Sequence, residues 1–190
     1  MKATIINGCE ESSQLLESVL NTCLKGLECK HIESSLFHLR EIQPKPCTGC
    51  DYCQTKNPGI CAITDGVGEI WRQYLNNEIA ILISPILFGC FNSLTKNFVD
   101  RAEPLCIPYQ VIHNGNTVMR PRYDRYPNLL IIGLAQDENS CPDIFRQAAL
   151  NSIFAHFSEH SVVEIIEAEK DAAELSAWLN SVISERRQVG

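Results

Sequence analysis

The 190-residue chain lacks the features that mark membrane proteins and nucleic-acid-binding proteins. No apolar run approaches the roughly 20 residues that a membrane-spanning helix needs. The formal net charge is −7 and the pI is about 5.2, whereas nucleic acids and anionic lipid surfaces attract cationic faces. We therefore expect no nucleic-acid partner and no membrane partner.

A secretory signal is also absent, because "MKATIINGCEES" contains no long apolar segment followed by small residues. This absence favours a cytoplasmic protein, in a compartment that keeps thiols reduced. The sequence has no internal repeat, low-complexity segment or linker. Because 45% of the residues are hydrophobic and 21% are charged, the composition is that of a folded chain, and we expect a single domain over 1–190.

Apolar runs alternate with helical patterns along the chain. The runs predict five strands, at 3–7, 30–39, 79–85, 128–135 and 161–168. Helical patterns follow each of them, the last at 171–187. Gly26 is expected to end the first helix, Asp65 to cap the second, and Asp143 to open a helix through "IFRQAALNSIFAHF" (144–157).

This alternation is typical of an α/β fold with a doubly wound parallel sheet. Five strands favour the flavodoxin-like order 2-1-3-4-5, in which ligands bind at the carboxyl ends of strands 1 and 3. The second strand is the most polar and is expected at or near a sheet edge. The irregular stretch 103–127 is a long insertion before strand 4, which predicts either a functional loop or an oligomer contact.

Four of the ten cysteines are concentrated in "PCTGCDYCQTKNPGIC" (46–61), a loop after strand 2. Cys47, Cys50, Cys53 and Cys61 are soft ligands that suit a [4Fe-4S] cluster or a zinc ion. Structural zinc sites usually place two cysteine arms a dozen or more residues apart, whereas here three cysteines follow one another at two-residue intervals, as in bacterial ferredoxins. The spacing favours a cluster; zinc and an unoccupied or partly oxidised thiol loop remain the alternatives.

A second motif carries a family resemblance. "SPILFGCFNSLTKNFVDR" (84–101) resembles the segment after the third strand of flavodoxin-like NADPH-dependent FMN reductases. Together with the cysteine motif, it resembles the iron-sulfur flavoprotein branch of that family, over about residues 1–135. The resemblance implies that the four cysteines hold a [4Fe-4S] cluster. It also implies that the loop after strand 3 lies against the flavin ring, through Pro85, Ile86, Leu87, Phe88 and Gly89.

The loop after strand 1, "NGCEESSQ" (7–14), is the expected site of the FMN phosphate. It combines a turn with hydroxyl groups and the N-terminus of a helix, which is a natural anion site. The predicted FMN-binding residues here are Gly8, Cys9, Ser12, Ser13 and Gln14. Related reductases have a longer loop that contains an arginine, whereas this loop has none and carries the acidic pair Glu10 and Glu11.

These features predict an FMN-dependent oxidoreductase, or electron-transfer flavoprotein, in which a [4Fe-4S] cluster exchanges single electrons with FMN. No side chain needs to act as an acid or a base. The resemblance implies a homo-oligomer, either a dimer or a tetramer, with NAD(P)H as a candidate donor and a ferredoxin-type protein as a candidate redox partner. Two alternatives remain, an NAD(P)H-dependent flavin or quinone reductase without a cluster and a degenerate, non-enzymatic cluster carrier.

Overall fold

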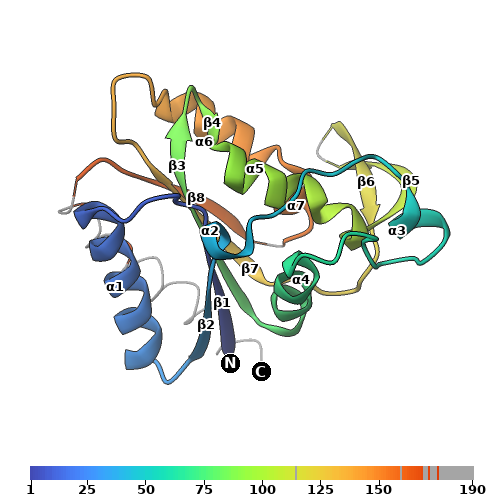
Figure 1. The fold of residues 1–190 in the computed structure, drawn as a ribbon, viewed down its shortest axis with the longest axis horizontal. Helices are drawn as coiled ribbons and strands as arrows, with labels where there is room; N and C mark the ends of the chain where they lie inside the picture. The colour runs from blue at the N-terminus through green and yellow to red at the C-terminus, as the bar shows by residue number, and fades with distance from the viewer. Residues whose placement is uncertain (114, 159, 169–170, 172–174, 176–190) are drawn as a thin grey trace.

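The computed structural model describes residues 1–113, 115–158, 160–168, 171 and 175 (Figure 1). The predicted last helix, 171–187, therefore lies outside the described residues except for Asp171 and Leu175. Within the described part of the chain, no helix is long and apolar enough to cross a membrane. The expectation of a single domain over 1–190 stays a prediction.

A parallel sheet forms the centre of the molecule. Its strands are β1 (Lys2–Asn7), β2 (Glu33–His38), β3 (Ile79–Leu87), β7 (Asn128–Leu134) and β8 (Ser161–Ile166), in the order β2-β1-β3-β7-β8. Numbered as parallel strands alone, this is the predicted flavodoxin-like order 2-1-3-4-5, and the polar second strand lies at the edge as expected. The sequence-based fold prediction is confirmed.

Helices cover both faces of this sheet. They are α1 (Gln14–Cys29), α2 (Leu39–Ile42), α3 (Tyr52–Thr55), α4 (Val67–Asn76), α5 (Ser93–Val99), the 3₁₀ helix η1 (Asp100–Leu105), α6 (Pro142–Leu150) and α7 (Ile153–His156). Helix α1 packs on one face, and α4, α5 and α6 lie on the other (Figure 1).

The two faces have separate apolar cores because successive strand residues point to opposite sides. Ile5 and Ile81 are buried against α1, whereas Ile6 and Leu82 are buried in the core that contains α4 and α5. Trp71 of α4 stacks on Phe98 of α5 with ring centroids 4.2 Å apart. This packing fixes α5 relative to the sheet.

Three helix predictions were wrong in detail. Helix α1 passes through Gly26 and ends at Cys29, because burial of Leu27 outweighs the cost of a helical glycine. The predicted helix from Asp143 breaks near Ser152 into α6 and α7. The N-cap of α4 is Gly66 and not Asp65, although Asp65 Oδ1 accepts the N–H of Val67, the first residue of the helix, at 3.3 Å; Asp65 Oδ2 has other partners, described below.

The insertion 103–127 contains an antiparallel hairpin, not an irregular loop. Strand β5 (Cys106–His113) pairs with β6 (Asn116–Pro121). The signal in the sequence is Asn114-Gly115, a dipeptide typical of tight hairpin turns. Tyr109 is 66% exposed and Ile112 is 82% exposed, and an oligomer contact in this region stays a prediction.

Strand β3 is longer than predicted. It continues past Pro85 to Leu87 and then turns back into β4 (Cys90–Phe91). The two turn residues, Phe88 and Gly89, have φ angles of +50° and +74°, which is the backbone pattern of a type I′ hairpin. The stretch predicted as a loop against the flavin ring is therefore mostly the end of a strand.

Gly89 is required by the fold itself. A Cβ atom there would lie 2.6 Å from Cγ2 and 2.8 Å from Cβ of Ile144, at a positive φ. We expect Gly89→Ala to lower the free energy of unfolding by at least about 1–2 kcal/mol, even without flavin. Gly68→Ala is the control, because a Cβ atom at Gly68 meets nothing within 4 Å. Urea unfolding of the two variant apoproteins measures their free energies of unfolding. If Gly89→Ala is as stable as Gly68→Ala, the backbone at Gly89 is not strained by a side chain.

Candidate functional site

A cavity of about 340 Å³ lies at the carboxyl ends of β1 and β3, where the flavodoxin-like fold binds its ligands. The residues that line it come from the loop after β1, the end of β3, the start of α5 and the residues after β7. They are Cys9, Glu10, Glu11, Ser12, Ser13, Pro85, Leu87, Asn92 and Gln136.

The loop after β1 is fixed against α5 by its backbone. Gly8 donates its N–H to Ile83 O at 2.8 Å, and Asn92 Nδ2 donates to Gly8 O at 2.9 Å. A Cβ atom at Gly8 would lie 1.9 Å from Thr95 Oγ1, so only glycine fits. The structure thus explains Gly8 by close packing on α5, and these hydrogen bonds hold the loop against β3 and α5.

The other predicted residues of this loop differ in what they offer. Ser13 caps α1 by accepting the N–H of Leu16 at 3.2 Å, whereas Ser12 is exposed on the cavity wall. Gln14 is the first residue of α1 and does not line the cavity. Cys9 is buried, and burial raises the pKa of its thiol to about 12, which makes it a small packing residue and not a nucleophile.

Arg40 supplies the positive charge that the loop lacks. It follows β2 and is half-buried, and its Nη1 donates to Ser12 Oγ at 3.1 Å. Strands β1 and β2 end side by side, with Asn7 paired to His38, so residues just after β2 lie beside the loop after β1. Arg40 was not among the residues predicted from the sequence, although this parallel pairing was the signal that could have identified it.

The end of β3 contributes alternate residues to the cavity. Pro85 and Leu87 line it, whereas Ile86 between them is 3% exposed and packs in the core. Phe88 and Gly89 form the hairpin turn and are not among the lining residues. Of the five residues predicted to contact the ring, the structure therefore brings two to the cavity.

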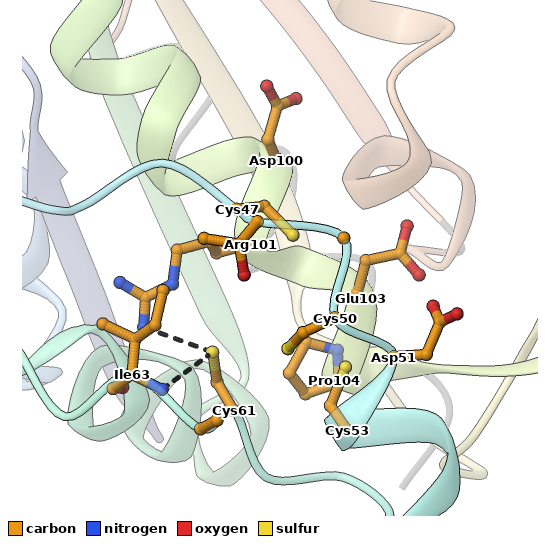
Figure 2. A pocket seen from close by; sticks show the side chains of 13 residues that line it. Cys47, Cys50, Asp51, Cys53, Cys61, Ile63, Asp100, Arg101, Glu103 and Pro104 are labelled. Atoms are coloured by element: carbon orange, nitrogen blue, oxygen red, sulfur yellow. Dashed lines mark hydrogen bonds between the residues drawn. The ribbon is translucent and has the colours of Figure 1, made fainter.

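The four cysteines of the loop line a second cavity, of about 540 Å³ (Figure 2). Cys47 and Cys50 precede α3, Cys53 lies within it, and Cys61 follows the turn at Gly59, whose N–H donates to Cys53 O at 2.9 Å. Residues Asp100, Arg101, Glu103 and Pro104, which belong to η1, form the opposite wall. Among the described residues, no group of three or more His, Cys, Asp or Glu side chains is close enough to hold a metal ion.

The sulfur atoms have different surroundings. Cys61 Sγ accepts hydrogen bonds from Ile63 N and from Arg101 Nη2, each at 3.5 Å. Burial raises the pKa of Cys53 to about 11, whereas the N–H of Tyr52 lowers the pKa of the exposed Cys50. Soft metal ions bind thiolates and deprotonate such thiols on binding. Four thiols on one cavity, one of them already accepting two N–H groups, are a donor set that fits an iron-sulfur cluster.

Comparison with known protein families assigns the chain to one of them. The model of the family described as NADPH-dependent FMN reductase matches residues 1–119. The chain belongs to this family. The cavity at the carboxyl ends of β1 and β3 lies where this fold binds its ligands, and it is called the flavin cavity below.

Curated relatives of this chain include several iron-sulfur flavoproteins. One from Methanocaldococcus jannaschii is 31% identical over 111 residues, which is 58% of this chain and 56% of the relative. One from Archaeoglobus fulgidus is 31% identical over 104 residues, which is 55% of this chain and 46% of the relative. The chain thus spans about half the length of the curated relatives it matches.

Solved structures confirm the fold at low sequence identity. An NAD(P)H:quinone oxidoreductase from Methanothermobacter marburgensis has a TM-score of 0.64, 10% identity and 93% coverage of both chains. An FMN-dependent NADH-azoreductase from Bacillus anthracis, solved in complex with FMN, has a TM-score of 0.60 and 12% identity, covering 97% of this chain and 99% of its own.

Proposed function

We propose that the protein is an FMN-dependent oxidoreductase that exchanges single electrons between FMN and a [4Fe-4S] cluster. One observation carries the proposal: the two cavities lie at opposite ends of the continuous segment α5–η1. Asn92 at its start lines the flavin cavity, and Arg101 near its end lines the cysteine cavity. Arg101 follows Asn92 by nine positions, which correspond to roughly 14 Å at the rise of an α-helix.

The residues of the first cavity fit FMN. Ser12 and the first N–H groups of α1 offer hydrogen-bond donors to a phosphate, and Arg40 offers a positive charge. Leu87 is 47% exposed and, with Pro85, gives an apolar surface suited to a flavin ring. When bound, FMN supplies a centre that holds one or two electrons. The chain binds and orients it; no acid or base is needed.

The residues of the second cavity fit a cluster through Cys47, Cys50, Cys53 and Cys61. When bound, a [4Fe-4S] cluster supplies a centre that takes up one electron at a time. A relative named as an iron-sulfur flavoprotein, 31% identical over 111 residues, supports the presence of a cluster. We further propose NAD(P)H or a ferredoxin-type protein as donor, and a homo-oligomer, dimer or tetramer, in which a cluster of one subunit lies near a flavin of another.

The second candidate function is a flavin or quinone reductase without a cluster, favoured by the separation of the described thiols. An anaerobic reductive titration distinguishes the two. With both centres present, complete reduction takes one more electron per chain than the bound flavin accepts. If the change in flavin absorbance accounts for every electron added, the protein is a reductase without a cluster.

The acidic pair in the phosphate loop should weaken FMN binding. Glu10 and Glu11 are both exposed on the cavity wall. At about 8 Å and an effective dielectric near 20, each costs on the order of 2 kcal/mol against one phosphate charge, which solvent reduces to about 0.5–1 kcal/mol. We expect Glu10→Gln with Glu11→Gln to tighten FMN roughly five- to thirtyfold.

The measurement is a titration of apoprotein with FMN at two salt concentrations, with riboflavin as the ligand that lacks a phosphate. The gain in FMN affinity of the double variant should shrink at high salt, and riboflavin should show no gain. An equal gain for both ligands would show that this loop does not face the phosphate.

A further inference from the structure

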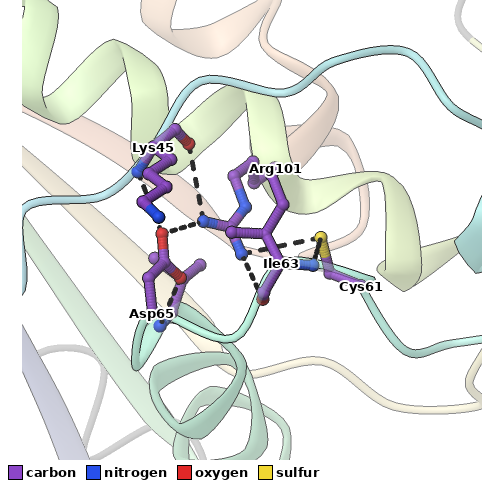
Figure 3. A network of polar contacts seen from close by, with 6 residues as sticks. Lys45, Cys61, Ile63, Asp65 and Arg101 are labelled. Atoms are coloured by element: carbon purple, nitrogen blue, oxygen red, sulfur yellow. Dashed lines mark hydrogen bonds and ion pairs between the residues drawn. The ribbon is translucent and has the colours of Figure 1, made fainter.

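A buried ion pair closes the base of the cysteine loop (Figure 3). The side chain of Arg101 is 1% exposed and that of Asp65 is 7% exposed. Asp65 Oδ2 accepts the Nη1–H of Arg101 and also the backbone N–H of Lys45 at 2.9 Å. Arg101 Nη1 in turn donates to Lys45 O at 3.4 Å. The chain is thus held two residues before Cys47.

The other arm of the same guanidinium holds the end of the loop. Arg101 Nη2 donates to Ile63 O at 3.1 Å and to Cys61 Sγ at 3.5 Å. Figure 3 shows Arg101 between Lys45 on one side and Ile63 and Cys61 on the other. One side chain therefore ties the residues on either side of the cysteine motif to η1 and also touches a ligand sulfur.

Stability alone does not account for this arrangement. Desolvation of two charges offsets most of their attraction, so a buried ion pair is weak support for a fold. Arg101 ends the motif that resembles the flavin-binding segment, yet it lines the cysteine cavity and is not among the residues of the flavin cavity. The planar guanidinium group of Arg101 carries several N–H donors in fixed directions, so this one side chain can donate to several acceptors.

We propose that Arg101 is a positioning residue of the cluster, which orients Cys61 and stabilises negative charge on its sulfur; this inference rests on the proposed function. Reduction adds one electron to the cluster, and no bond forms or breaks. The added charge is shared by the sulfur ligands, so an N–H donor to sulfur stabilises the reduced state more than the oxidised state. Arg101 should therefore raise the reduction potential.

Two variants separate hydrogen bonding from ion pairing. Arg101→Met with Asp65→Asn removes both charges together, so neither is left buried without a counter-charge. Arg101→Lys keeps the cation beside Asp65 but has no second arm for Cys61. The control is Glu69→Gln with Arg72→Gln, which also removes an arginine–carboxylate ion pair. The side chains of this pair are 48% and 58% exposed.

The readouts are iron per chain and the midpoint potential from an anaerobic titration followed by electron paramagnetic resonance. At a fixed potential, we expect a tenfold lower ratio of reduced to oxidised cluster in both Arg101 variants, a shift of about 59 mV for one electron. The control should match the wild type. Loss of iron from both Arg101 variants, with FMN and the fold retained, also supports positioning of Cys61.

The contradicting outcomes are distinct. If the wild type contains a cluster and both Arg101 variants keep its iron content and potential, the inference is wrong and the proposed function stands. If Arg101→Lys restores the wild-type potential, Arg101 acts only through its charge and the hydrogen bond to Cys61 has no role. A wild-type protein without iron overturns the proposed function and this inference with it.

Discussion

Changing Cys50 to serine should remove most of the iron and sulfide from anaerobically prepared protein and leave the FMN in place. Cys50 is exposed, its side chain lines the cysteine cavity, and it lies in the loop outside both apolar cores. A hydroxyl is a poor substitute for a soft thiolate ligand of iron. Loss of the ligand should therefore affect the cluster without unfolding the sheet that forms the flavin cavity.

Cys29→Ser is the matched control, because Cys29 is also an exposed free cysteine but lies at the end of α1. Iron, sulfide and FMN per chain are measured for both variants, together with far-ultraviolet circular dichroism. Equal iron in Cys50→Ser and Cys29→Ser would remove Cys50 from the ligand set. Simultaneous loss of FMN and iron would mean that the loop supports the flavin cavity directly.

Arg40→Gln should weaken FMN binding roughly 10- to 100-fold. A hydrogen bond to a charged group contributes about 1.5–3 kcal/mol, and about 1.4 kcal/mol is tenfold in affinity. Arg40 is the cation that contacts Ser12 on the wall of the flavin cavity, next to an acidic loop. Its loss leaves the phosphate beside Glu10 and Glu11 without this compensating charge.

Riboflavin again separates phosphate binding from ring binding, and Arg120→Gln is the control for net charge, because Arg120 is exposed on β6. Fluorescence titration of the apoproteins should show weaker FMN binding only in Arg40→Gln, with unchanged riboflavin affinity. If Arg40→Gln weakens both ligands equally, Arg40 supports the cavity but does not contact the phosphate.

The sheet was predictable because its central strands, β1, β3 and β7, are buried on both faces. Runs such as 79–83 are continuously apolar, and a helical pattern follows each one, so their number and order follow from general rules of α/β folds. The cysteine motif was equally visible, since its spacing is local. The structure adds that all four thiols line one cavity.

Contacts between distant segments were not predictable from local patterns. Arg40 reaches Ser12 only because β1 and β2 pair in parallel, and Arg101 reaches Asp65 only because η1 packs against the loop before α4. The extension of β3 to Leu87 was hidden because Pro85 resembles a strand terminator, although β3 continues through it. In the two arginine contacts the deciding interaction joins residues far apart in the sequence, whereas the end of β3 is set by its local hairpin with β4.

The pairing of FMN with a cluster is tested most directly by composition. Wild-type protein is purified without oxygen, and its iron, acid-labile sulfide, zinc and FMN are quantified per chain. The proposal predicts about four iron and four sulfide atoms per chain, together with FMN, and no stoichiometric zinc. FMN with zinc, or FMN with no metal at all, would contradict it and leave a flavin reductase with a structural thiol loop.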